Sequence, residues 1–185
     1  MQRIGVIGDN HSRVADGQDL PQGVLDAFKE VDLIVHCGDA GTWGTLDRLE
    51  TVASVVAVLG GHNGEGVDRR VAGEKRVVDL AGVRAGVVHD LVKQGVLTES
   101  NPRMVPASGD LAGALRGFFE EDVDLVLYAG THVPRIGWTG GILMVNGGSP
   151  TLPLDRPKGS PGSVAIVEID ENVVTARIVD LRAGS

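Results

Sequence analysis

Histidines and aspartates gather at the ends of apolar runs in this 185-residue chain. The residues concerned are His11, His36, His62, His89 and His132, with Asp9 and Asp39, each aspartate directly after a glycine. A single histidine at such a place is more often a hydrogen-bonded structural residue than a ligand. Ligand sites of α/β folds form at the carboxyl ends of strands, so seven such residues together predict a site.

The donor types indicate the chemistry of that site. Imidazoles and carboxylates without a thiolate cluster suit Mn, Fe, Ni or Zn rather than a structural zinc. Two such ions about 3.5–4 Å apart would clamp a phosphoryl group during in-line displacement and activate a hydroxide. The pattern therefore favours metal-dependent chemistry on a phosphoester.

Apolar runs and turn residues predict the elements that position these groups. Helices are expected over Pro21–Glu30, with Asp19 as its cap, Trp43–Glu50 and Asp110–Glu121. Single strands are expected at Arg3–Ile7, Asp32–His36, Ser54–Leu59 and Asp124–Ala129. Hairpins are expected at 76–89, 135–146 and 163–181, and residues 91–109 are expected to form a mobile loop. Early strands alternate with helices and late strands come in hairpins, which indicates a mixed sheet, or two packed sheets, with helices outside.

Composition excludes several classes of protein. The formal net charge of -8 and the pI of about 5.0 argue against a nucleic-acid backbone or an anionic membrane as partner. One cysteine, Cys37, excludes an internal disulfide framework and fits a reducing compartment. No apolar run has the length of a membrane span. We expect a single cytoplasmic domain over residues 1–185, with homo-oligomerisation left open.

Six fragments carry a resemblance to a known family. They are Asp9-Asn10-His11, Gly38-Asp39, Gly60-Gly61-His62-Asn63, His89, Thr131-His132-Val133-Pro134 and Asn146-Gly147-Gly148-Ser149. In this order they resemble the calcineurin-like metallophosphoesterases, and most closely their small bacterial and archaeal phosphodiesterase branch, which includes the retromer scaffold subunit. Each fragment is weak alone, but six in the right order and spacing are strong, and the resemblance spans residues 4–170. The resemblance implies an α-β-β-α sandwich of two packed mixed β-sheets, with the metal site at the carboxyl ends of the strands.

The resemblance also implies a role for each matching residue. Asp9, His11 and His132 would bind the first metal, and Asp39 would bridge to a second. His89 would bind that second metal. His62 would contact the substrate or the leaving group, as the catalytic residue.

Two departures from the family pattern affect only the second metal. Gly61 stands where the family has an asparagine ligand, and Gly130 replaces the first histidine of the Gly-His-Thr-His pair. We therefore expect one tightly bound divalent metal, most simply Mn²⁺, with Fe, Ni or Zn as alternatives, and a second that is weak or absent. Asn63 and Asp90 are candidates to replace the missing ligands or to contact substrate.

Two functions fit these residues. The first is a phosphodiesterase or phosphatase in which a metal-bound hydroxide attacks a small phosphoester. The second is a binding or scaffold module that keeps the fold but has lost efficient catalysis. The reduced number of ligands for the second metal favours the scaffold. The complete ligand set for the first metal and the presence of His62 favour the enzyme, which is the interpretation we prefer.

Overall fold

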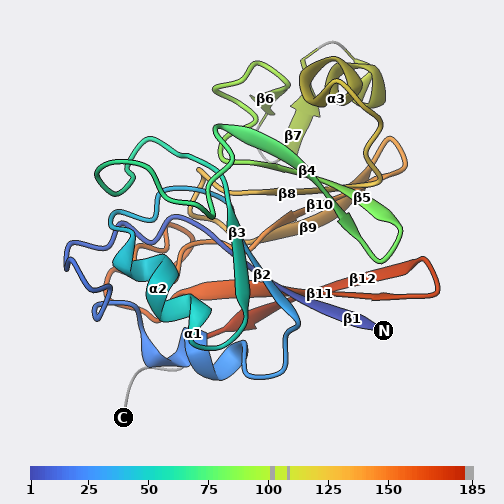
Figure 1. Ribbon diagram of the computed structural model, residues 1–185. Coiled ribbons are helices and arrows are strands. Elements are labelled where there is room, and N and C mark those ends of the chain that lie inside the picture. The colour runs from blue at the N-terminus through green and yellow to red at the C-terminus, as the bar shows by residue number, and fades with distance from the viewer. Residues whose placement is uncertain (101–102, 108, 182–185) are drawn as a thin grey trace.

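Two five-stranded mixed sheets stack against each other in the computed structural model, which describes residues 1–100, 103–107 and 109–181 (Figure 1). The first sheet has the order β12-β11-β1-β2-β3 and contains β1 (Gln2–Ile7), β2 (Leu33–His36), β3 (Ser54–Ala57), β11 (Ser163–Asp170) and β12 (Val173–Asp180). The second has the order β4-β5-β8-β10-β9 and contains β4 (Lys75–Leu80), β5 (Val83–Val88), β8 (Leu125–Tyr128), β9 (Arg135–Thr139) and β10 (Ile142–Asn146).

Parallel strands form the part of each sheet that carries the candidate residues. Strand β2 pairs in parallel with β1 and β3, and β8 pairs in parallel with β5 and β10. The antiparallel partners β11, β12, β4 and β9 enter through hairpins or at the edges. Because parallel strands end at the same edge of a sheet, the loops after β1, β2, β3, β5 and β8 can meet.

Helices cover the outer face of each sheet. Helices α1 (Gln22–Ala27) and α2 (Gly44–Glu50) lie on the first sheet, and α3 (Leu111–Phe119) lies on the second (Figure 1). One apolar cluster lies between each sheet and its helices, and another fills the space between the two sheets. Val35 of β2 and Leu127 of β8, both 0% exposed, belong to the cluster between the sheets. This arrangement confirms the α-β-β-α sandwich.

Helix α3 has a side-chain cap, whereas the expectation for α1 was wrong in two respects. Asp110 accepts a hydrogen bond from Gly113 N at 3.1 Å and caps α3. Helix α1 ends at Ala27, and it has Pro21 at its N-cap with no side-chain cap. Asp19 instead accepts bonds from the Ser12 hydroxyl and, at 2.8 Å, from Arg13 N. It therefore ties down the loop after β1 rather than the helix.

Residues 91–109 also differ from expectation, because strands β6 (Leu97–Ser100) and β7 (Arg103–Pro106) form an antiparallel pair there. The residues between these strands, 101–102, lie outside the described residues. Within the described ranges, no helix combines the length and the apolar character needed to cross a membrane.

Candidate metal centre

All five sequence-predicted ligands and the predicted catalytic residue His62 converge where their strands end. Three overlapping groups have one donor atom per residue within 4.8 Å of one another: Asp9 with His11 and His132; His11 with Asp39 and His62; and Asp9 with Asp39 and His89. Asp9 and His11 follow β1, Asp39 follows β2, His62 follows β3, His89 follows β5, and His132 follows β8. Both sheets therefore contribute donors to one centre.

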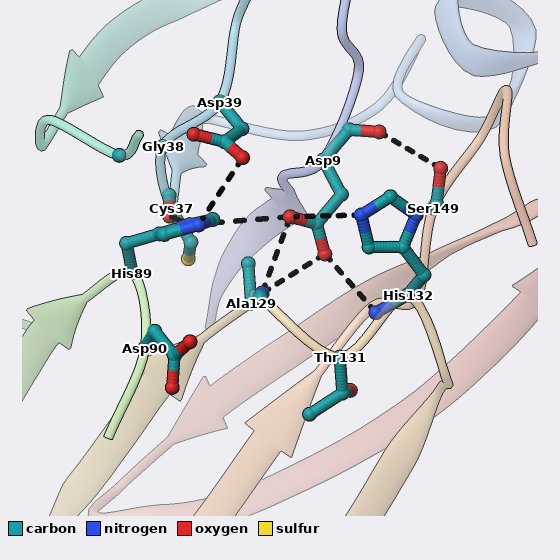
Figure 2. Close-up of polar contacts among 12 residues, drawn as sticks. Asp9, Cys37, Gly38, Asp39, His89, Asp90, Ala129, Thr131, His132 and Ser149 are labelled. Atoms are coloured by element: carbon teal, nitrogen blue, oxygen red, sulfur yellow. Dashed lines mark hydrogen bonds and ion pairs between the residues drawn. The ribbon is translucent and has the colours of Figure 1, made fainter. Parts of the chain in front are cut away.

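Asp39 lies in the middle of this centre. Its Oδ2 atom is 3.5 Å from His11 Nε2 and 3.3 Å from His89 Nε2. On the other side, His11 Nε2 is 3.2 Å from His132 Nε2. Figure 2 shows the Asp9 carboxylate between His89 and His132, with Asp39 beside His89. One Asp39 oxygen thus faces both predicted metal positions.

Four of the donors have an uncommon backbone conformation. Asp9, His11, Asp39 and His132 have φ of 55°, 48°, 57° and 59°, in the left-handed region that side chains other than glycine seldom adopt. The other non-glycine residues with positive φ in the described ranges are Ala81, Glu120, Glu171 and Asn172, which lie in hairpin turns or at the end of α3. Such strain concentrates at functional sites, where the surrounding structure must hold it.

Backbone bonds hold the strained residues in place. Asp9 N donates to Gly38 O at 3.1 Å and His11 N donates to Asp39 O at 2.9 Å, so the loops after β1 and β2 support each other. The Asp9 carboxylate accepts from Gly130 N at 2.9 Å and from His132 N at 3.3 Å, which attaches the loop after β8. Three loops are therefore fixed around one buried carboxylate.

Hydrogen bonds to carbonyl groups orient two of the imidazoles. His89 Nδ1 lies 2.9 Å from Cys37 O, and His132 Nδ1 lies 2.8 Å from Leu152 O. Since a carbonyl only accepts, each Nδ1 must carry the proton, and the lone pair of each neutral ring is then at Nε2. Both Nε2 atoms face the cluster. A backbone partner of this kind is typical of metal-binding histidines.

Burial and charge act against each other in the cluster. Burial disfavours ionised Asp39, but in the metal-free chain hydrogen bonds from protonated His89, whose own pKa Asp39 raises, and from the backbone of His62 outweigh it and hold the pKa of Asp39 below its usual range. Burial raises the pKa of Asp9, although His132 and His89 oppose the rise. Burial also lowers the pKa of His11, against the opposing effect of Asp39. A neutral imidazole beside an ionised carboxylate is the protonation state that a metal requires.

His36, one of the seven residues first considered for the site, lies at the end of β2 outside these groups. Its Nε2 donates to Asn10 Oδ1 at 3.1 Å, and its Nδ1 accepts from Gly38 N at 3.1 Å. Burial lowers the pKa of His36 to about 3. Cys37 is 0% exposed, and burial raises the pKa of its thiol, so it has no reactive character. Both residues support the site rather than bind a ligand.

The two candidate replacement ligands are engaged elsewhere. The Asn63 side chain accepts from Gly60 N at 2.9 Å and donates to Gly60 O at 2.8 Å. Asp90 Oδ1 accepts from the backbone of Val92 and Lys93 at 2.9 and 3.0 Å. Figure 2 draws Asp90 next to His89 but outside the network of contacts. Asp90 belongs to none of the three donor groups found in the described chain.

Gly61 and Gly130 have different surroundings. A Cβ at Gly61 would meet only Asp39 Oδ1, at 3.8 Å, so the space of the lost asparagine is open. A Cβ at Gly130 would lie 3.0 Å from Asp90 Cβ and 3.1 Å from Asp90 Cγ, at a φ of 84°. Asp90 thus occupies the space that a histidine at position 130 would need. Restoring that histidine would require a smaller residue at position 90.

Ser149 is a site residue whose role the sequence did not reveal. Its hydroxyl donates to Asp9 O at 2.8 Å and accepts from Leu152 N at 2.8 Å. Leu152 O is in turn the acceptor that orients His132. The Asn146-Gly147-Gly148-Ser149 fragment signalled this region, but only the fold connects it to both Asp9 and His132.

Comparison with known proteins identifies the family. The model of the calcineurin-like phosphoesterase superfamily domain matches residues 2–172. The chain belongs to this superfamily. A probable metallophosphoesterase of Methanocaldococcus jannaschii is 35% identical over 81% of this chain and 69% of its own length. A probable metallophosphoesterase of Methanothermobacter thermautotrophicus is 31% identical over 95% of this chain and 91% of its own.

A solved structure has the same fold. Vps29 of Entamoeba histolytica, in complex with Zn²⁺, superposes with a TM-score of 0.65 at 22% identity, covering 97% of this chain and 99% of that one. The metal dependence of this phosphoesterase family fits the donor set of the present chain, since imidazole nitrogens and carboxylate oxygens suit a divalent transition ion.

Proposed function

We propose that this phosphoesterase-family chain is a phosphodiesterase that hydrolyses a small phosphoester with one tightly bound divalent ion, Mn²⁺ in the simplest case. Asp9, His11, Asp39 and His132 hold that ion. The observation that carries the proposal is their backbone: all four are strained into the left-handed region, and no hairpin turn accounts for it. A fold that needed no ligand there would gain nothing from a strain of about 1–3 kcal/mol per residue.

The second metal position is weaker because two of its ligands are absent. Asp39 and His89 remain there, and their nearest donor atoms are 3.3 Å apart. Gly61 and Gly130 contribute no side-chain donor. Apart from Asp9, which serves the first ion, an ion at this position has one shared carboxylate and one imidazole, and it is easily lost to solvent.

The chain's own residues divide the remaining chemistry. When bound, the divalent ion supplies Lewis-acid stabilisation of the phosphate and activates the attacking water. His62 Nδ1 lies 3.4 Å from Asp39 Oδ2, and its backbone N donates to Asp39 Oδ1 at 2.7 Å. The His62 side chain is 72% exposed, so its Nε2 can face an arriving substrate. We assign His62 as the general acid that protonates the leaving oxygen.

Charge favours a diester over a monoester. The centre contains the carboxylates of Asp9 and Asp39 in a chain of net charge -8. The bound ion balances these two carboxylates, but the chain as a whole stays negative. A phosphodiester carries one negative charge and a monoester approaches two at neutral pH, so the diester is repelled less. The single cysteine, buried and free, fits a cytoplasmic setting.

Hydrolysis of bis(p-nitrophenyl) phosphate tests the proposal. The wild type should show slow turnover stimulated by Mn²⁺. His62→Ala should lower the rate by about 10²–10⁴-fold, the usual contribution of a general acid, with metal content unchanged. Asp39→Ala should lose both metal and turnover. Absence of turnover with Mn²⁺, Zn²⁺, Fe²⁺ and Ni²⁺ alike would refute the enzyme.

A scaffold role is the second candidate, and the loss of two second-metal ligands favours it. A scaffold has no use for His62, whose ring is 72% exposed beside Asp39. Turnover that is absent in the wild type and still absent in Gly61→Asn would support the scaffold, because the space at Gly61 accepts a side chain.

A further inference from the structure

A small hollow adjoins the second-metal position. It has a volume of about 160 Å³, and its lining includes Gly60, Gly61, His89, Asp90 and Lys93. Pockets for whole organic ligands usually measure about 300–1,000 Å³, so this one suits a phosphoryl group with its water rather than a complete substrate. His89 belongs both to the lining and to the metal centre, which makes the hollow continuous with that centre.

Among the described residues that line the hollow, Lys93 is the only lysine or arginine. It lies in the turn that follows β5, and its backbone N donates to Asp90 Oδ1 at 3.0 Å. Leu91, 0% exposed, anchors the same turn in the core of the second sheet. The base of the Lys93 side chain is therefore fixed beside the hollow.

The ammonium group of Lys93 is held only loosely. Its Nζ lies 3.9 Å from Asp90 Oδ2, at the long end of an ion pair, and the side chain is 73% exposed. Exposed pairs of this kind contribute about 0–1 kcal/mol, so redirecting the ammonium toward a ligand costs little. Its flexible four-carbon stem gives the reach for that movement.

A phosphate bound at this centre needs a positive charge on the hollow side. In a two-metal site the second ion holds the phosphate oxygen that the first does not. Here that ion lacks two ligands, and the carboxylates of Glu74 and Asp90 line the hollow. Without a cation between them, these carboxylates would repel a phosphate oxygen.

From this geometry we propose that Lys93 binds a phosphoryl oxygen of the substrate in place of the second metal. The inference rests on the proposed phosphoesterase function. A charged N–H donor to a phosphate oxygen is among the stronger hydrogen bonds and stabilises charge that develops during displacement. Loss of the second-metal ligands is then compensated from the turn after β5.

Calorimetric titration of inorganic phosphate into the Mn²⁺-loaded protein tests this role without requiring turnover. Lys93→Met should weaken phosphate binding about 10-fold, which corresponds to about 1.4 kcal/mol, with metal content unchanged. Lys93→Arg should retain most of the affinity. Lys29→Met is the matched control, because Lys29 is also exposed (69%) and also pairs with an aspartate three residues before it, Asp26.

The outcomes separate this inference from the proposed function. Equal phosphate affinity in the wild type and Lys93→Met, with wild-type turnover intact, would overturn the role of Lys93 and leave the phosphoesterase standing. Equal weakening in Lys29→Met and Lys93→Met would also overturn it, because the effect would then reflect net charge alone. A wild type that neither binds phosphate nor turns over a diester would refute both proposals.

Discussion

Asp39 presents one carboxylate oxygen to two imidazoles, 3.5 Å from His11 Nε2 and 3.3 Å from His89 Nε2. Its other oxygen accepts a hydrogen bond from the backbone of His62 at 2.7 Å. The residue therefore connects the loops after β2, β3 and β5. A change at Asp39 should affect every part of the centre, whereas a change at His89 should affect only the side that lacks ligands.

We therefore predict that Asp39→Ala weakens metal binding more than His89→Ala does. The Asp39→Ala substitution removes a donor from the tight first-metal site, whereas His89→Ala removes one only from the second-metal position, which already lacks ligands. Competition with a fluorescent chelator would give the affinity of both variants, and a metal-dependent rise in melting temperature should persist in His89→Ala but vanish in Asp39→Ala. Equal affinities would contradict the assignment of His89.

At the residue scale the sequence predicted which side chains gather but not how they are held. Residue types and order indicated Asp9, His11, Asp39, His89 and His132. The left-handed backbone at four positions and the space filled by Asp90 beside Gly130 depend on loops that meet only after both sheets form. No local pattern in the chain contains that information.

At the scale of elements, the loop after β3 carries His62 and depends on one buried arginine. The Arg70 side chain is only 4% exposed, and it bonds to Asp68 within the loop and to Asp47 at 2.7 Å and Glu50 at 3.1 Å in α2. Its carbonyl also accepts from Ala57 N of β3 at 2.9 Å. Arg70 thus fastens the loop to α2 and to the edge of the first sheet.

Arg70→Met should lower the free energy of unfolding by about 1.5–3 kcal/mol, because Asp68, 11% exposed, loses its charged hydrogen-bond partner, whereas the more exposed Asp47 and Glu50 are rehydrated. Arg69→Met is the control: Arg69 is 74% exposed and pairs with Glu50 at 2.7 Å, so its loss should cost about 0–1 kcal/mol. Urea denaturation measures both. Similar losses of unfolding free energy in the two variants would show that the ion pairs of Arg70 do not hold the loop to α2.

Elements with a strong alternation of apolar and polar residues were predictable from the sequence. Elements whose bounds or pairing depend on tertiary contacts were not. The hairpins at 76–89, 135–146 and 163–181 follow from alternation and turn residues, and the structure contains all three. Helix α1 ends at Ala27 rather than at Glu30, and Asp19 bonds to the loop after β1 instead of capping the helix. Strands β6 and β7 have little pattern of their own, and their pairing was missed.

At the scale of the molecule, the α-β-β-α sandwich buries His36 at the end of β2 as a neutral imidazole. Burial lowers the pKa of His36 to about 3, below the 6.5 of an unfolded histidine. The unfolded chain therefore binds a proton between these values that the folded chain does not. The resulting stability is full above pH 6.5 and is lost as the pH falls toward 3.

Between pH 7 and pH 5, the metal-free wild type should consequently lose about 2 kcal/mol more stability than His36→Gln, at about 1.36 kcal/mol per pH unit below 6.5. Comparing the two proteins removes contributions from the other histidines, which act with both signs. Urea denaturation at pH 7, 6 and 5 in the presence of chelator measures the difference. Parallel stability curves would mean that His36 is not held neutral.

The central claim is that one metal per chain suffices for phosphodiester hydrolysis, and a titration of activity tests it most directly. Mn²⁺ would be added in fractions of an equivalent to chelator-treated protein while hydrolysis of bis(p-nitrophenyl) phosphate is followed. We predict that the rate rises linearly up to one equivalent of Mn²⁺ and then stays level. The reason is that the first ion occupies the tight site, formed by Asp9, His11, Asp39 and His132. A rate that appears only during the second equivalent, or that never appears, would contradict the account.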